Sequence, residues 1–174
     1  IRFKSAQNDS NLSDCFFISR DNKRSMNTAA ATRPWQGFLV GGLLAGSLDL
    51  TSAYISYGMN VPRGIAAGLL GPSARQGGVG PYILGIFIHF FIAMSAAFVF
   101  YLASRKLGFM VQHPVVCGLF FGIAVFLVMN LIVLPLSAIH FQGPYTWRGL
   151  VQGLLIHMIC IGLPISFSVR QFSK

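Results

Sequence analysis

One acidic side chain lies within a long apolar segment, where it could take part in proton or metal chemistry. Asp49 is the only Asp or Glu after Met26, and the residues around it are mostly apolar. A carboxylate at membrane depth is costly and usually faces a partner or a wet cavity. Three other apolar segments each carry one polar side chain of interest. The sequence therefore predicts a buried polar layer formed by Asp49, His89, Asn130 and His157.

Three roles fit such a layer. In a structural role, Asp49 pairs with a histidine and Asn130 bonds across helices, contacts that average only about 0.6 kcal/mol in membranes. In a second role, Asp49 and the histidines handle a proton or an ion. In a third, His89 and His157 are the two axial ligands of a b-type haem in an electron-transfer subunit. A metal ion held by Asp49 and both histidines has no supporting ligand spacing.

Enzymatic chemistry is not predicted. No nucleophile–base pair or phosphate-binding loop is found, and one acid after Met26 excludes a pair of catalytic carboxylates there. The three cysteines, Cys15, Cys117 and Cys160, form no CxxC motif, so neither a disulfide framework nor a zinc site is expected. We therefore expect a non-enzymatic protein with no catalytic residues, no metal and no cofactor, the haem alternative excepted.

Composition points to the membrane. The chain has 174 residues, of which 54% are hydrophobic and 10% charged, and its mean hydropathy is +0.65. Ordinary soluble domains carry roughly 25% charged residues. The net charge of +9 comes from basic residues that occur singly or in pairs between apolar runs, which does not form the basic stripe of a nucleic-acid-binding protein. The predicted partner is the lipid bilayer, with no nucleic acid.

Four stretches are long enough to cross a hydrocarbon core about 30 Å thick, which takes roughly 20 helical residues. The predicted spans are residues 37–57, 82–103, 115–136 and 149–169. Together they predict an all-α membrane protein, an up-and-down bundle of four transmembrane helices. Between the first two spans, Asn60-Val61-Pro62 can open a short helix that Gly71-Pro72 ends. We expect this helix to be interfacial or re-entrant, with a loop on the headgroups as the alternative.

Helix positions place the polar layer and its packing. At about 1.5 Å per residue, its four members lie about 18–22 Å from the cytoplasmic ends of their spans. Small residues at helical spacings from these members allow helix backbones to approach closely. The predicted packing positions are Gly42, Gly46, Gly85, Gly118, Gly122 and Gly153.

The basic residues predict the orientation. Arg33, Arg105, Lys106, Arg170 and Lys174 fall on one side of the spans, against Arg63, Arg75 and Arg148 on the other. By the positive-inside rule, both termini are then cytoplasmic. Residues 1–25 are polar and hold three of the four acids, and they are expected to be a disordered or non-native leader, with a genuine cytoplasmic tail as the alternative. Residues 26–174 are expected to form one four-span domain.

Several runs carry a family resemblance: Gly46–Asp49, Leu69–Pro72, His113–Gly118, Met129–Ser137 and Ile156–Pro164. In these runs, the chain from about Trp35 to Arg170 resembles a group of small uncharacterised bacterial inner-membrane proteins with four helices. The resemblance implies a multi-pass protein of the bacterial inner membrane and no established activity. A conduit built from only four spans would need a homodimer or a larger membrane complex.

Overall fold

The structure, a computed structural model, describes residues 34–140 and 146–173, and these residues are helical with no strand among them. Four helical stretches are long and apolar enough to cross a membrane: Trp35–Tyr57, Val79–Lys106, Pro114–Leu136 and Trp147–Phe172. Each predicted span falls within one of them. The described chain is therefore an all-helical protein with the character of a multi-pass membrane protein. The predicted leader, residues 1–25, lies outside the described residues.

Several stretches are interrupted by turns of other helical types. The α-helices are α2 (Pro34–Tyr57), α3 (Val61–Leu70), α4 (Val79–Lys106), α5 (Phe109–Gln112), α6 (Pro114–Val128), α7 (Leu134–Leu136), α8 (Trp147–Ile156) and α9 (Leu163–Phe172). A 3₁₀ turn covers Pro72–Gln76, and π-helical turns cover Met129–Val133 and His157–Gly162. The two ends of the long helices are named after the short helices beside them. The α3 end is the end at which α2 stops and α4 and α8 begin. The α5 end is the end at which α4 stops and α6 begins.

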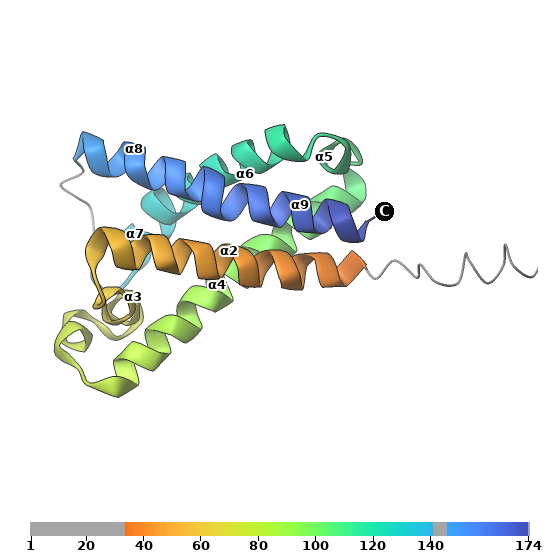
Figure 1. The fold of residues 1–174 in the computed structure, drawn as a ribbon. Coiled ribbons are helices and arrows are strands. Elements are labelled where there is room, and N and C mark those ends of the chain that lie inside the picture. The colour runs from red at the N-terminus through yellow and green to blue at the C-terminus, as the bar shows by residue number, and fades with distance from the viewer. Residues whose placement is uncertain (1–33, 141–145, 174) are drawn as a thin grey trace, which may run out of the picture. The chain divides into compact units, whose positions relative to one another are not determined.

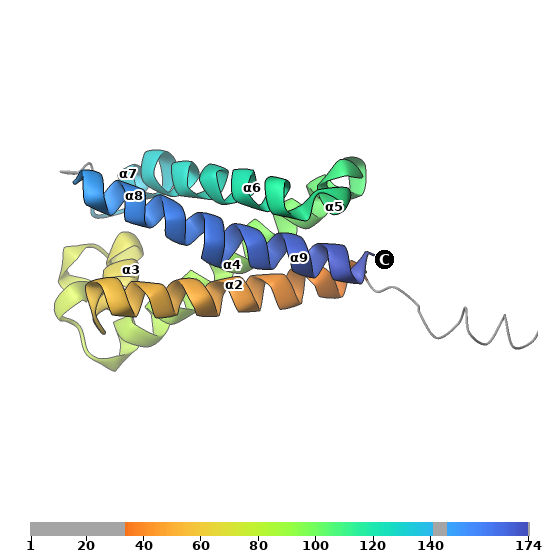
Figure 2. The same cartoon turned by 45° about the horizontal axis from the view of Figure 1, so that its top comes forward.

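Helix α2 has neighbours on two sides. It packs against α4 on one side and against α9 and the preceding π turn on the other, while α6 packs against that same π turn and α9. Figures 1 and 2 show α2 and the α8–α9 stretch side by side, with α4 passing obliquely behind them. The apolar core lies toward the α5 end and comprises Ala45, Ala97, Phe100, Tyr101, Ile161, Ile165 and Val169.

Glycines make these close contacts possible. A Cβ on Gly46 would lie 2.9 Å from the Phe90 ring of α4, and a Cβ on Gly41 would lie 3.1 Å from the Ile165 backbone of α9. Between α6 and the last span, Gly118 and Gly162 approach backbone to backbone, so neither has room for a side chain. Helices in lipid associate largely through such packing.

The two π turns precede Pro135 and Pro164, and in both cases the helix continues. Proline lacks an N–H and its ring collides with the preceding helical turn, so a regular α-helix cannot pass through it unchanged. A wider π turn relieves that conflict locally. Each of the last two spans therefore consists of two α-helical segments joined by a π turn.

The predicted short helix between the first two spans is present as α3. Its buried residues are Pro62, Ala66 and Ala67, and it packs on α4. Leu69 and Leu70 at its end are 64% and 53% exposed. The Ala138 amide donates to the Gly68 carbonyl at 2.7 Å, which ties α3 to the chain after α7. Whether α3 is interfacial or re-entrant stays a prediction.

The packing of α3 against α4 can be tested by substitution of Gly85. A Cβ there would overlap the Pro62 backbone of α3, whereas a Cβ on Gly80, earlier in the same helix, would meet nothing within 4 Å. Overpacking of this kind costs about 1–3 kcal/mol. We expect Gly85→Ala to lower the thermal unfolding midpoint in detergent and to speed tryptic cleavage after Arg63 and Arg75. Gly80→Ala should change neither, and equal behaviour of both variants would contradict this packing.

Candidate functional site

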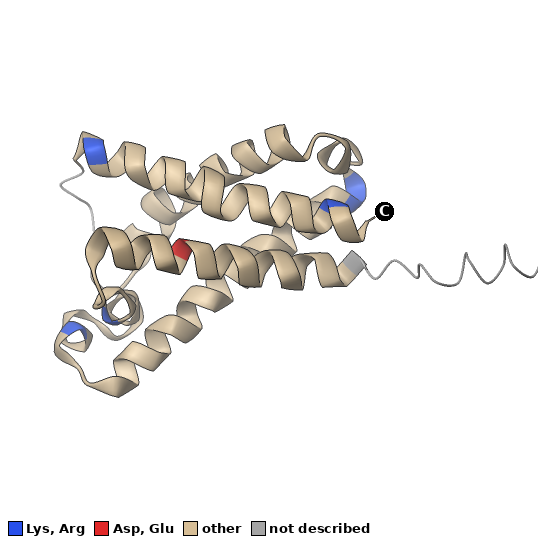
Figure 3. Cartoon of the chain, viewed as in Figure 1, with Lys and Arg blue, Asp and Glu red and all other residues tan. Residues whose placement is uncertain are grey.

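Asp49 on α2 lies beside His89 on α4. The distance from Asp49 Oδ2 to His89 Nε2 is 3.9 Å, and the side chains are 18% and 12% exposed. Figure 3 shows a single acidic position in the interior of α2, with Lys and Arg toward the ends of the helices. A carboxylate and an imidazole at this distance can form an ion pair when the imidazole is protonated.

One hydrogen bond defines which ring nitrogen of His89 carries a hydrogen. His89 Nε2 lies 2.9 Å from the main-chain oxygen of Gly46. A carbonyl oxygen only accepts, so Nε2 carries a hydrogen and Nδ1 is the ring position that gains or loses a proton. Within the described residues, the Asp49 carboxylate accepts no hydrogen bond, and its charged neighbour is His89.

Asn130 and His157 both contact Phe126 of α6. The Asn130 side-chain amide donates to the Phe126 carbonyl at 2.9 Å, where the first π turn begins. The His157 ring lies 5.5 Å from the Phe126 ring between centroids, and His157 Nδ1 donates to the Gly153 carbonyl at 2.8 Å. Two contacts between helices therefore involve the predicted polar residues: Asp49 with His89 between α2 and α4, and His157 with Phe126 between the last span and α6.

The hydrogen bonds of the two histidines limit which ring nitrogens could bind a haem iron or another metal. Each histidine has one ring nitrogen bonded to a main-chain carbonyl, which leaves Nδ1 of His89 and Nε2 of His157 as the nitrogens that could bind haem iron. In the part of the chain that the structure describes, no group of three or more His, Cys, Asp and Glu side chains is placed to hold a metal ion. The haem hypothesis stays a prediction.

A second polar cluster lies toward the α3 end of the same two helices. The hydroxyls of Tyr54 on α2 and Tyr82 on α4 are 3.0 Å apart. The Arg63 guanidinium of α3 lies 5.4 Å from the centre of the Tyr82 ring, and it also donates to Asn60 Oδ1. The α2–α4 interface is thus polar on the α3 side of Asp49 and His89, and apolar on the α5 side, where the core lies.

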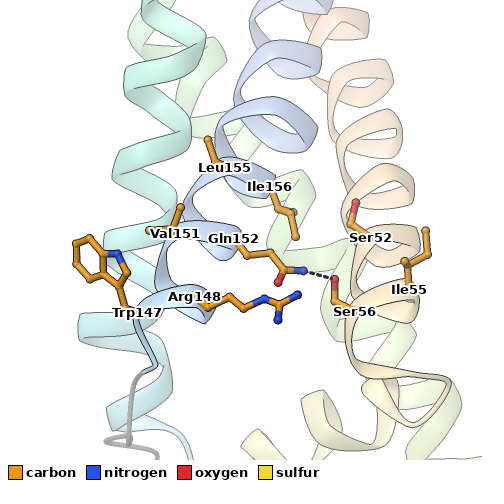
Figure 4. Close-up of a pocket in the computed structure, with 9 residues that line it drawn as sticks. All are labelled: Ser52, Ile55, Ser56, Trp147, Arg148, Val151, Gln152, Leu155 and Ile156. Atoms are coloured by element: carbon orange, nitrogen blue, oxygen red, sulfur yellow. Dashed lines mark hydrogen bonds between the residues drawn. The ribbon is translucent and has the colours of Figure 1, made fainter.

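A groove of about 560 Å³ opens at the α3 end between α2 and α8. Figure 4 shows the residues that line it: Ser52, Ile55, Ser56, Trp147, Arg148, Val151, Gln152, Leu155 and Ile156. The Gln152 amide donates to Ser56 Oγ across the groove at 2.8 Å. The sequence analysis missed this site, although Ser52 and Ser56, and likewise Arg148 and Gln152, are four residues apart and so share a helix face.

Comparison of the chain with protein-family models, with curated proteins and with solved structures finds no match. Function must therefore be inferred from the geometry of the residues themselves. The Asp49–His89 pair offers an acid and an imidazole within helices long and apolar enough to cross a membrane, and the groove offers a cation beside apolar walls. These two features can bind a proton and an anion, respectively.

The tyrosine contact can be tested by a double-mutant cycle. Tyr54→Phe and Tyr82→Phe each remove one hydroxyl, and a hydrogen bond of this type contributes roughly 0.5–1.5 kcal/mol. We expect the two single substitutions to destabilise the protein and the double substitution to cost less than their sum, measured by denaturant unfolding in mixed micelles. Tyr57→Phe, at an exposed tyrosine, is the control and should be neutral. Strictly additive costs would contradict a direct contact.

Proposed function

We propose that this is a non-enzymatic component of the bacterial inner membrane whose Asp49–His89 pair takes up and releases a proton. In this proposal, the four apolar helices form an up-and-down bundle with both termini cytoplasmic. The observation that carries it is the placement of Asp49, the only acid after Met26, inside a helix long enough to span and 3.9 Å from a histidine. Intramembrane acids beside histidines are typical of proton relays.

The pair has two charge states that differ in cost. With His89 protonated at both nitrogens, the imidazolium and the carboxylate neutralise each other. Without the proton on Nδ1, the negative charge of Asp49 has no charged partner among the described residues, and a partly buried charge without a partner is unfavourable. Proton movement through this part of the protein therefore involves both residues.

The geometry favours proton uptake over a purely structural role for Asp49. A structural carboxylate is normally fixed by hydrogen bonds, because leaving a buried polar group unsatisfied costs free energy. Here Asp49 is 18% exposed, and 3.9 Å is longer than a hydrogen bond. A carboxylate that no donor among the described residues holds by a hydrogen bond contributes little to fixing the helices in place, which favours the proton role.

The packing supports proton entry from the α3 end. On the α5 side of the pair, Ala97, Phe100 and Tyr101 of α4 belong to a buried core. On the α3 side, the hydroxyls of Tyr54 and Tyr82 lie between the pair and Arg63. In the proposed orientation this side is periplasmic. A homodimer or a larger complex would supply the route to the other side.

Substitution of Asp49 tests the proposal. Asp49→Asn keeps the shape of the side chain and removes its charge, so we expect a folded protein whose proton flux falls at least tenfold, to the level of empty vesicles. The measurement is dye-reported internal pH after an external pH step on reconstituted vesicles. Ser95→Ala is the control, since Ser95 is exposed on α4 and bonds only the Phe91 carbonyl of its own helix. Unchanged flux in Asp49→Asn would refute proton handling and leave the structural role.

A reduced-minus-oxidised absorbance spectrum of protein purified from its native membrane tests the haem alternative. On the proton proposal, we expect no b-type signal. A signal at about one haem per chain, lost in either His89→Ala or His157→Ala, would instead identify an electron-transfer subunit with two axial histidines.

A further inference from the structure

In the groove between α2 and α8, Arg148 is a cation with no carboxylate partner among the described residues. Asp49 is the only acid among the described residues, and its ion pair is with His89. Figure 4 shows the Arg148 side chain extending between the two helices, toward Ser56. A guanidinium presents several N–H donors in one plane, which suits the oxygens of a phosphate.

Ser56 can add a donor at the same place. Its oxygen accepts the Gln152 amide hydrogen at 2.8 Å, so its own hydroxyl hydrogen is not used in that bond. The hydroxyl and the guanidinium thus come from opposite walls of the groove. Two donors on facing helices, one of them charged, favour an anion over a neutral ligand.

The walls of the groove indicate that this anion belongs to a lipid. Ile55 and Leu155 are 83% and 49% exposed, on stretches long and apolar enough to lie among acyl chains. Trp147, next to Arg148, is 81% exposed, and tryptophan at the end of a span favours the headgroup level. Free phosphate would use only the polar rim, whereas a phospholipid would also cover the apolar wall.

We infer that this groove binds an anionic phospholipid, with Arg148 and Ser56 contacting its phosphate and an acyl chain lying along Val151 and Leu155. Basic pockets between transmembrane helices on the cytoplasmic side bind acidic headgroups, and in the proposed orientation this groove would use the same chemistry in the periplasmic leaflet. A zwitterionic lipid carries its own cation and gains less from Arg148. The inference requires the membrane placement of α2 and α8 but not proton transfer at Asp49.

The test is a titration of the full chain, purified in an uncharged detergent, with phosphatidylglycerol. Native mass spectrometry reports adducts, and thermal unfolding reports stabilisation. We expect one tightly held lipid per chain and an affinity at least tenfold weaker in Arg148→Gln, with a smaller loss in Ser56→Ala. Arg75→Gln is the matched control, because Arg75 is an exposed arginine at the same end that does not line the groove.

Each remaining arm of the titration can overturn the inference. Equal binding of phosphatidylcholine would exclude selection for a net negative headgroup. Equal stabilisation by inorganic phosphate would make the site one for free anions. Full binding by Arg148→Gln, or an equal loss in Arg75→Gln, would remove the groove as the site. Arg148 is exposed, so its substitution should leave unfolding without lipid unchanged. Asp49→Asn should bind the lipid normally, which separates this inference from proton handling.

Discussion

Helix α2 carries glycines on two sides, and each side receives a neighbouring helix at close range. In lipid, apolar side chains gain little from leaving their surroundings, so association depends on how closely backbones can approach. A Cβ on Gly46 would meet Phe90 and Ala93 of α4, so its absence lets α4 approach closely, and His89 of α4 then lies 2.9 Å from the Gly46 carbonyl. That bond orients the imidazole beside Asp49. The packing of α2 and the chemistry of the pair therefore depend on one constraint.

Much of the architecture could be predicted because length and apolar composition are enough to locate a span. The short helix α3 was also predictable, since Asn60-Val61-Pro62 and Gly71-Pro72 mark its ends. Counting residues along each span predicted a similar depth in the membrane for four polar residues, Asp49, His89, Asn130 and His157. Such a count does not show which neighbouring helix each side chain faces. The structure places Asp49 beside His89 between α2 and α4, and His157 beside Phe126 of α6. The groove was missed because its walls, joined by Gln152 and Ser56, are 96 residues apart in sequence.

The two ends of the described helices differ in character. Toward the α5 end, aromatic and aliphatic side chains fill the space between helices, and the Phe100 and Phe121 rings lie 5.0 Å apart. Toward the α3 end, tyrosine, serine, glutamine and arginine side chains bond between helices or line a groove. Both proposals, proton uptake at Asp49 and lipid binding in the groove, therefore use the α3 end of the helices.

The π turn at His157–Gly162 has a consequence for how the faces of the last helical stretch are read from the sequence. Successive residues of an α-helix are rotated by about 100°, and a π turn takes up one additional residue in about one helical turn. A repeat of three and four residues therefore loses its phase on passing from α8 to α9. The π turn thus frees the face of α8 that carries Gln152 from following the same repeat as Ile165 and Val169 in the core.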